Sequence, residues 1–340
     1  MAERIYLAAN NPDLGGGEEM LVRTAKALVS LDREVTVVAP DMPSDVLDAA
    51  GTVGADVIGI RARGRRDHLV RLREWDRHER RGLLWCHGLV PALATAGHRR
   101  RIVHLHQLPR SRTQWAALHL ARLGGAPVLV PSEFLAALVT GARPCPNWTD
   151  QVDLGAPPPR GLAVGFLGRL SSDKGLVLLA DAMASVRVDP AARLVVAGDA
   201  RWVPDDQRAA VAQALGRLGS RTELIGRTPP DELFARVDLA VFPSTVPESF
   251  GLVVAEAMAA GVPFVISDAG ALPEVAGPDH PWVARSGDVD DLARVIHAAL
   301  TAPEADVRAV TDRARRRWET EYSPQAGRLR VRRLLEELAP

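Results

Sequence analysis

Residues 240–267 read AVFPSTVPESFGLVVAEAMAAGVPFVIS, and this stretch contains a strand, a proline-broken loop, a helix and a second strand. The first strand ends at Pro243, because proline cannot donate a backbone hydrogen bond to a sheet. From about Gly251 the sequence favours a helix that ends at Gly261, and the second strand begins at Phe264. A strand, a helix and a returning strand predict one unit of a parallel α/β sheet.

Two glutamates lie near the start of this helix. Glu248 falls in the loop before the helix, and Glu256 lies a turn or more inside it, on the order of 7 Å along the axis from the helix start. At that separation the two carboxylates can accept hydrogen bonds from different sugar rings of one ligand. The amides of residues 249–252, at the positive end of the helix, can bind phosphate or hydroxyl groups.

The alternative is that Glu248 is a simple helix-start charge and Glu256 an exposed helix residue. The sequence around Glu256, LVVAEAMAA, argues against the second half of that alternative, because the neighbours are apolar. A carboxylate buried there without a partner would be costly.

Short apolar runs alternate with helical segments along the whole chain. Its 340 residues exceed one ordinary domain, and a hydrophobic content of 47% suits sizeable cores. The apolar runs predict buried strands, and the alternation predicts two parallel, doubly wound sheets wrapped by helices. The predicted strands are RIYLAA, EVTVVAP, ADVIGI, LLWCHG, RIVHLH and PVLVPS in the first half, and GLAVGFLGR, RLVVAGD, TELIGR, LAVFPS and PFVIS in the second.

A proline-rich segment separates the two halves. Residues 155–161 read GAPPPRG, and three consecutive prolines cannot join a central strand or a helix interior. We therefore predict an N-terminal domain over 1–156, a C-terminal domain over 160–322, and a closing helix within 323–340. The leucines of this last segment recur near helical spacing, at Leu329, Leu334, Leu335 and Leu338.

Composition narrows the classes of function. The formal net charge is zero, which gives no electrostatic reason to expect nucleic acid as a partner. The two cysteines, Cys86 and Cys145, supply neither a disulfide framework nor a metal set, which fits a reducing compartment. The sequence shows no signal-peptide pattern and no run approaching about 20 apolar residues. We expect a soluble, cytoplasmic protein.

Ligands of parallel sheets collect at the carboxyl ends of the strands, where this sequence has two glycine-containing loops. The first, NNPDLGGGEEM, has three glycines that let the backbone approach a ligand, and Glu18 lies in the opening turn of the next predicted helix. The loop lacks the GxGxxG spacing of a nicotinamide site. A plain strand-to-helix turn explains this loop equally well.

The second loop, GRLSSDKG, places Arg169 and Lys174 five residues apart after a predicted strand. Their side chains can converge on one anion, and a diphosphate is the candidate because both cations bind phosphate oxygens. The alternative is an ordinary solvated pair of charges. The sequence contains only one other lysine, Lys26, so the lysine in this loop stands out.

Together these motifs resemble those of the retaining glycosyltransferases of family four, which have the GT-B fold. The resemblance rests on Glu248 and Glu256 with seven residues between them, on the following AMAAGVPFV, and on GRLSSDKG, LVVAGD and PDLGGGEE. It implies two Rossmann-like domains facing a cleft. The C-terminal domain would bind a nucleotide-diphosphate sugar donor, and the closing helix would cross back to the N-terminal acceptor domain.

The resemblance also implies roles for individual residues. Arg169 and Lys174 would bind the donor diphosphate, Glu256 the ribose hydroxyls and Glu248 the transferred sugar. Gly226 and Arg227 would lie near the base. The remaining donor contacts would come from Gly16 in the first domain and from Ser249, Phe250, Gly251 and Leu252.

A histidine completes the set that the resemblance implies. RIVHLHQLPRS ends a predicted strand with His104 and His106, and alternation puts both side chains on one face. The family often has a histidine at the end of the corresponding strand, which implies that His106 contacts the transferred sugar. His87 in LLWCHG competes for this role. The His and Cys spacing does not match a zinc set, so we predict no metal site.

The implied reaction is a transfer with retention of configuration on one face of the sugar. Its catalytic groups would be Glu248, His106, Arg169 and Lys174, and neither a cofactor nor a metal ion is required in that scheme. Three alternatives remain open: a GT-B nucleotide-sugar epimerase, a phosphorylase, and a non-catalytic partner of another transferase.

The acceptor is not identified by any motif. Residues 61–81 are basic and carry Trp75 in a predicted amphipathic helix. An anionic small-molecule or lipid-linked acceptor, or an anionic membrane surface, is one interpretation of this segment. A solvated helix face is the other.

Overall fold

The computed structural model describes residues 3–154, 162–185 and 192–338, and the chain divides into two compact units. The first unit comprises Met1–Trp148 with Pro324–Pro340, and the second comprises Thr149–Ser323. The predicted boundary segment, 155–161, lies outside the described residues.

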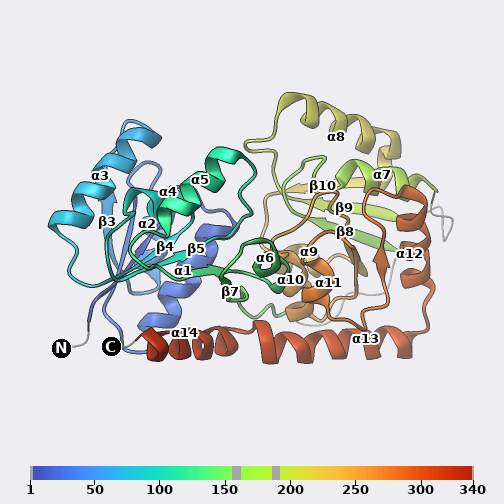
Figure 1. Ribbon diagram of the computed structural model, residues 1–340. Coiled ribbons are helices and arrows are strands. Elements are labelled where there is room, and N and C mark those ends of the chain that lie inside the picture. Colours follow the sequence, from blue (N-terminus) through green and yellow to red (C-terminus); the bar gives the residue numbers. More distant parts are fainter. Residues whose placement is uncertain (1–2, 155–161, 186–191, 339–340) are drawn as a thin grey trace. The chain divides into compact units, whose positions relative to one another are not determined.

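A seven-stranded parallel sheet forms the centre of the first unit (Figure 1), in the order β3-β2-β1-β4-β5-β6-β7. The elements of this unit, in chain order, are β1 (Ile5–Ala8), α1 (Gly16–Val29), β2 (Val35–Pro40), α2 (Asp45–Thr52), β3 (Asp56–Ile60), α3 (Arg65–His78), β4 (Leu83–His87), α4 (Leu89–Ala94), β5 (Arg101–His104), α5 (Arg112–Ala121), β6 (Val128–Val130), α6 (Glu133–Leu138), β7 (Ala142–Pro144) and α14 (Pro324–Leu338).

The second unit is built around a six-stranded parallel sheet in the order β10-β9-β8-β11-β12-β13. Its elements are β8 (Ala163–Leu167), α7 (Leu176–Ser185), β9 (Arg193–Ala197), α8 (Asp205–Leu218), the 3₁₀ turn η1 (Gly219–Arg221), β10 (Thr222–Gly226), α9 (Pro230–Phe234), β11 (Leu239–Phe242), α10 (Leu252–Ala260), β12 (Phe264–Ser267), α11 (Leu272–Ala276), β13 (Val283–Ala284), α12 (Val289–Thr301), α13 (Glu304–Arg317) and the π-helical turn η2 (Trp318–Tyr322).

Each sheet has one point where the strand order reverses. In the first unit β1 and β4 are neighbours, and in the second unit β8 and β11 are neighbours. The loops that follow such a pair of strands diverge to opposite faces of the sheet and leave a crevice for ligands. Both glycine-containing loops predicted from the sequence follow one of these strands, β1 or β8.

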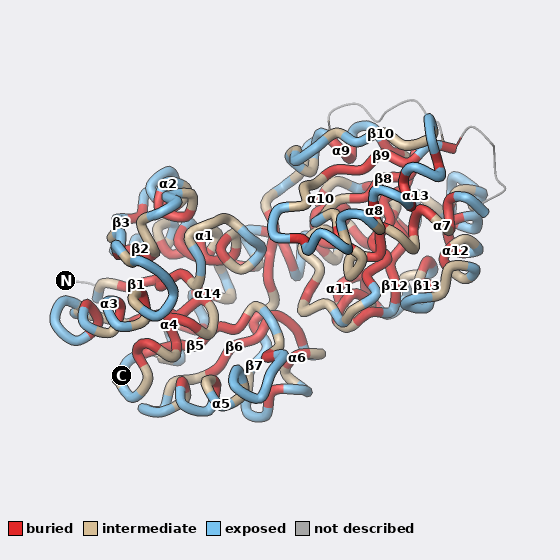
Figure 2. The backbone as a smooth tube through the Cα atoms, turned by 90° about the horizontal axis from the view of Figure 1, so that it is seen from above, coloured by how far each residue is buried: buried red, intermediate tan, exposed pale blue. Residues whose placement is uncertain are grey.

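Every strand predicted from an apolar run is present. The central strands are buried as expected (Figure 2), but burial was wrongly predicted for β3 and β10. Val57 is 46% exposed and Leu224 is 60% exposed. Both strands lie at the edge of their sheets, so each pairs with one neighbouring strand.

The closing helix α14 packs against α1 in the first unit. Val331 and Leu334 form its buried face, whereas Leu329 is 39% exposed. Gly327 lies against the Trp148 indole, and a Cβ at this position would overlap with the ring. The absence of a side chain at Gly327 therefore lets the helix approach Trp148.

The two units divide at Trp148 and Thr149, earlier than the predicted boundary segment. The Thr149 N–H donates to the Tyr322 carbonyl at 3.0 Å, and its hydroxyl accepts from Trp318 Nε1 at 2.8 Å. Val152 and Leu154 then pack against the apolar core of the second unit. These contacts place residues 149–154 in the second unit.

The basic segment of the first unit forms the amphipathic helix α3. Leu72 and Trp75 are buried, and the Trp75 ring meets the Tyr6 ring edge to face at 5.3 Å. Most of its arginines, such as Arg66 and Arg77, are exposed. Among the described residues, each helix is either too short or too polar to span a bilayer.

Candidate functional site

The loop between β8 and α7 carries the two predicted phosphate-binding cations. Its backbone is fixed by the Leu170 N–H, which donates to the Asp199 carbonyl at 2.8 Å. At the other end, Gly175 has φ +76°, and a Cβ there would overlap with the Pro243 carbonyl oxygen. The absence of a side chain at Gly175 therefore lets this loop lie against the end of β11.

The two cations of the loop bind different carboxylates. Arg169 Nη2 lies 2.6 Å from Asp173, which also accepts a hydrogen bond from the Ser171 hydroxyl. Burial by itself would raise the pKa of Asp173. The Ser171 hydroxyl, Arg169 and Lys174 have the opposite and larger combined effect, so the net shift of the pKa is downward. Asp173 thus stays ionised, and it is a partner of Arg169 that the sequence did not predict.

Lys174 instead pairs with Glu248 across the point where the strand order reverses. Lys174 Nζ lies 2.6 Å from Glu248 Oε1, and the Ser244 hydroxyl donates to the same oxygen. The Glu248 carbonyl accepts from the Ala271 N–H at 2.9 Å. The Lys174 side chain is 33% exposed and that of Glu248 is 16% exposed, so solvent and ligands can reach the pair.

Glu256 lies in α10, which begins one residue after Gly251 and ends before Gly261, as predicted. Gly251 adopts φ +99°, a left-handed conformation that suits glycine and directs the chain from the Glu248 loop into the helix. Glu256 is the fifth residue of α10, roughly 6 Å along the axis from its start, and is buried. The prediction that Glu256 is not a simple exposed helix residue is therefore confirmed.

The other predicted donor residues of the second unit lie at the same edge of the sheet. Phe250 is buried and meets the Tyr322 ring edge to face at 5.3 Å. Gly226 ends β10 with φ +73°, and its carbonyl accepts from the Gly198 N–H at 2.8 Å. Arg227, the next residue, is exposed. All follow carboxyl ends of parallel strands, where ligands bind.

The predicted residues of the first unit, Gly16 and His106, also follow carboxyl ends of strands. Gly16 is the first residue of α1 and is exposed. Its neighbour Gly17 lies against His106, because a Cβ at Gly17 would come within 3.2 Å of the imidazole ring. The start of α1 and His106 are thus brought together.

Glu18, noted in the sequence only for its place in the first turn of α1, is buried in the structure. Glu18 Oε1 accepts from the backbone N–H of Asn11 at 3.1 Å and from Asn11 Nδ2 at 2.8 Å. Burial raises the pKa of this carboxyl to about 7, although these hydrogen bonds act in the opposite direction. A glutamate that titrates near neutral pH was not foreseen.

Three histidines meet in the first unit, His87, His104 and His106. The rings of His104 and His106 are 4.4 Å apart between centroids, and those of His87 and His106 are 5.1 Å apart. Burial lowers the pKa of His106 to about 4 and holds those of the other two well below the usual range. The sequence placed His104 and His106 on one face and treated His87 as a rival, but the structure unites all three.

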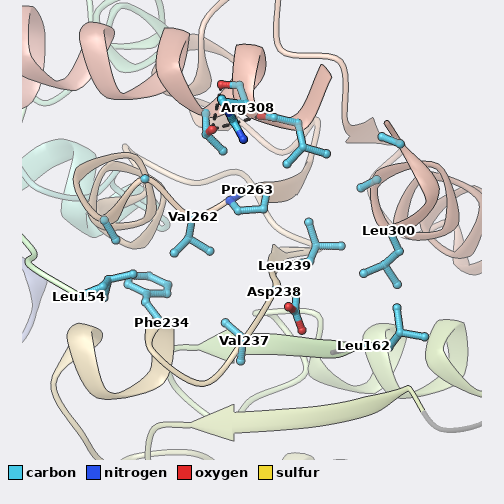
Figure 3. Close-up of a pocket in the computed structure, with 16 residues that line it drawn as sticks. Leu154, Leu162, Phe234, Val237, Asp238, Leu239, Val262, Pro263, Leu300 and Arg308 are labelled. Atoms are coloured by element: carbon cyan, nitrogen blue, oxygen red, sulfur yellow. Dashed lines mark hydrogen bonds between the residues drawn. The ribbon is translucent and has the colours of Figure 1, made fainter. Parts of the chain in front are cut away.

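A separate pocket of about 490 Å³ lies in the second unit, lined mostly by apolar side chains such as Phe234, Val262 and Leu300 (Figure 3). Asp238 lies in its wall, and Asp238 Oδ2 accepts from the Ala163 N–H at 2.9 Å. Asp238 precedes β11, so the pocket borders the amino end of this strand. The described residues that line this pocket do not include any of the predicted donor-binding residues.

Comparison with known proteins finds a family profile that matches part of the second unit. Residues 161–302 match the sequence profile described as Glycosyl transferases group 1. These residues fall in the second unit and contain Arg169, Lys174, Glu248 and Glu256.

Two relatives match parts of the chain. The chain is 42% identical over 96 residues to the MMP alpha-(1->4)-mannosyltransferase of Mycolicibacterium hassiacum, covering 28% of this chain and 23% of that protein. It is 26% identical over 249 residues to the sulfoquinovosyl transferase SQD2 of Arabidopsis thaliana, covering 65% of this chain and 46% of that protein. The chain thus spans less than half the length of these relatives.

The fold of this chain matches that of a solved structure over nearly the whole length of both chains. HepE of Anabaena in complex with UDP-glucose superposes with a TM-score of 0.82 at 21% identity, covering 98% of this chain and 100% of that chain. Two parallel sheets of seven and six strands with flanking helices agree with this likeness. The predicted fold class, GT-B, is confirmed.

Proposed function

We propose that this protein is a glycosyltransferase that moves a hexose-type sugar from a nucleotide-diphosphate sugar to an acceptor hydroxyl, with retention of configuration. The observation that carries the proposal is the contact between Lys174 and Glu248, 2.6 Å apart beside the start of α10. We assign Lys174 to the diphosphate and Glu248 to the transferred sugar. These two groups are bonded to each other in a nucleotide sugar, so their protein partners must be neighbours.

For the remaining donor contacts we propose the roles that the family resemblance implies. Glu256 accepts hydrogen bonds from the ribose hydroxyls, Gly226 and Arg227 lie beside the base, and Arg169 exchanges its Asp173 contact for the diphosphate. Ser249, Phe250, Gly251 and Leu252 contribute backbone groups at the start of α10. For Gly16 and His106, in the first unit, we keep the roles that the family resemblance implies, at the diphosphate and the transferred sugar.

In the proposed reaction the acceptor oxygen bonds to the anomeric carbon as the bond from that carbon to the phosphate oxygen breaks. The acceptor proton passes to the leaving phosphate oxygen. Lys174, Arg169 and the amides of α10 stabilise the charge that develops on the diphosphate. With these cations in place the reaction needs neither a cofactor nor a divalent metal ion, so turnover should persist in EDTA.

The first test is a thermal-shift screen against nucleotide sugars. A ligand at 100 times its dissociation constant stabilises the folded chain by roughly 2.7 kcal/mol, which such a screen detects. A stabilising donor is then incubated with and without acceptors, and the anomeric configuration of the product is read by NMR. An inverted linkage, or conversion of the donor without an acceptor or only with inorganic phosphate, would contradict the proposal.

A pair of variants separates the two glutamates. Glu248→Gln should lower turnover strongly with little change in nucleoside diphosphate affinity, because the bare nucleotide lacks the sugar. Glu256→Gln replaces a charged acceptor of ribose hydroxyls and should weaken nucleoside diphosphate binding roughly tenfold or more. Calorimetry that finds wild-type nucleotide affinity for Glu256→Gln would remove this residue from the donor site.

A further inference from the structure

Two of the three clustered histidines end neighbouring strands of the first unit. His87 is the last residue of β4 and His104 the last residue of β5, and the two are register partners in the parallel sheet. His106 follows two residues later. Each of the three offers a ring nitrogen, and these nitrogens all lie within 4.8 Å of one another.

The ring nitrogens of this cluster lack other partners. His87 Nδ1 lies 3.0 Å from His106 Nε2. Within the described part of the chain, His87 Nε2, His106 Nδ1 and both nitrogens of His104 are buried without a hydrogen-bond partner. His104 is 1% exposed and His87 is 2% exposed. A buried polar group without a partner costs about 1–3 kcal/mol, so three such rings side by side need an explanation.

We propose that His87, His104 and His106 bind a divalent transition-metal ion, with zinc as the best fit. Imidazole nitrogen is a preferred zinc ligand, and three histidines with an open fourth position form a known type of zinc coordination. At a Zn–N distance of about 2.0–2.1 Å, tetrahedral ligands lie roughly 3.3 Å apart. Since the ring nitrogens lie within 4.8 Å of one another, each pair needs to approach by about 1.5 Å at most to reach this spacing.

The surroundings of the cluster favour a defined geometry. The Trp85 ring stacks on the His87 ring at 5.8 Å between centroids, and the start of α1 lies against His106 at Gly17. Two ligands are fixed by paired strands, so they are held in place before an ion binds. His106 is only partly buried, which leaves a route of entry on its side.

One consequence rests on the proposed function. Because His106 is also our contact for the transferred sugar, a zinc ion would occupy that imidazole and lower the rate of transfer, and a chelator would restore it. Metal binding itself is tested without donor or acceptor. Its outcome is therefore independent of whether the chain is a transferase.

The test is calorimetric titration of the untagged, chelator-treated 340-residue chain with zinc chloride, together with the absorption spectrum of the cobalt(II) form. We expect one zinc ion per chain and a cobalt spectrum typical of tetrahedral coordination. His104→Gln should weaken zinc binding roughly tenfold or more, because even loss of a group that only supports a ligand costs that much. His119→Gln is the matched control, since His119 is an exposed histidine of the same unit.

A second variant covers the case in which His104→Gln does not fold. His106→Gln changes the least buried of the three rings, and circular dichroism verifies its fold. Zinc affinity lost in a folded variant and kept in His119→Gln supports the site. Wild-type protein that binds no zinc near one equivalent, or folded His104→Gln and His106→Gln variants that bind zinc like wild type, would overturn it.

Discussion

The ion pair of Lys174 and Glu248 connects two loops that are 74 residues apart in the chain. Since the lysine is about one-third exposed, water screens the pair, and exposed pairs contribute only about 0–1 kcal/mol to stability. The pair therefore has little value as a stabilising contact. Its position at the reversal of strand order makes it suited to binding a ligand.

Removing the lysine should separate function from folding. We expect Lys174→Ala to lower transfer roughly a hundredfold or more, because it removes the cation that we propose stabilises the leaving diphosphate, while the melting temperature changes little. Arg169→Ala should act in the same direction. Initial rates at saturating donor and thermal unfolding measure the two effects.

The sequence offers a matched control for the lysine. Lys26, the other lysine of the chain, is exposed on α1, and Lys26→Ala should retain wild-type turnover. Near-normal turnover of Lys174→Ala would remove the lysine from the diphosphate site.

Glu18 predicts a pH dependence of stability in the first unit. Its pKa is about 7 in the folded chain, above the ordinary value of 4.5, so the folded state binds this proton more tightly than the unfolded state does. The corresponding stability is present below about pH 4.5 and is lost as the pH rises through 7, an effect on the order of 3 kcal/mol.

Glu18→Gln keeps an oxygen that accepts from Asn11 but carries no charge. We expect the variant to be more stable than wild type at pH 8 and to approach wild-type stability at pH 5, measured by urea unfolding at both values. Glu19→Gln, at the neighbouring, more exposed position, is the control. A stability difference that does not change between the two pH values would contradict the raised pKa.

The histidine cluster shows where sequence reasoning stops at the scale of residues. Local spacing rules detect ligands from one turn or loop, but His87 and His104 meet because β4 and β5 pair in parallel, 17 residues apart. The signal was present as two histidines that each end a predicted strand. Knowledge of which strands are neighbours was missing, and this comes only from the fold.

At the scale of elements, apolar runs in the sequence located all strands of the two sheets except two. They missed β7 and β13, which have three and two residues and no apolar run of their own. They also did not distinguish edge from centre, since Val57 and Leu224 have the side chains of buried strands but lie in edge strands. The sequence pattern predicts that a segment forms a strand, whereas the burial of that strand depends on which elements lie beside it in the fold.

Helix α14 offers a test of close packing. Gly327→Ala should destabilise the protein by about 1–3 kcal/mol, because the added methyl group would overlap with the Trp148 indole. Gly216→Ala is the matched control in α8, where nothing lies within 4 Å of an added Cβ. That substitution should stabilise by about 0.5–1 kcal/mol through helix propensity.

Denaturant unfolding followed by circular dichroism compares the two glycine variants. Equal stability of both would show that α14 does not need the close approach to Trp148.

For the whole molecule, the sequence predicts donor residues in the second unit more specifically than acceptor residues in the first. GRLSSDKG and PESFGLVVAE carry charged groups at fixed positions beside glycines and prolines, so local chemistry is enough to propose their roles. The first unit has the matching sheet, but its exposed basic helix α3 does not specify one acceptor. Ligands of open parallel sheets bind at loops that follow several strands, so no single motif records all the contacts.

The two cysteines allow transient unfolding of the first unit to be measured separately from unfolding of the second. Cys86 and Cys145 are both buried in the first unit as free thiols, and the sequence has no other cysteine. Burial raises the pKa of each thiol to about 11. A thiol reagent should therefore label the native chain only during rare openings of this unit, and the labelling rate gives the free energy of opening. Labelling in native buffer as fast as in urea would contradict this burial. If a nucleoside diphosphate slows the reaction, donor binding is coupled to the stability of the unit that carries neither Lys174 nor Glu248.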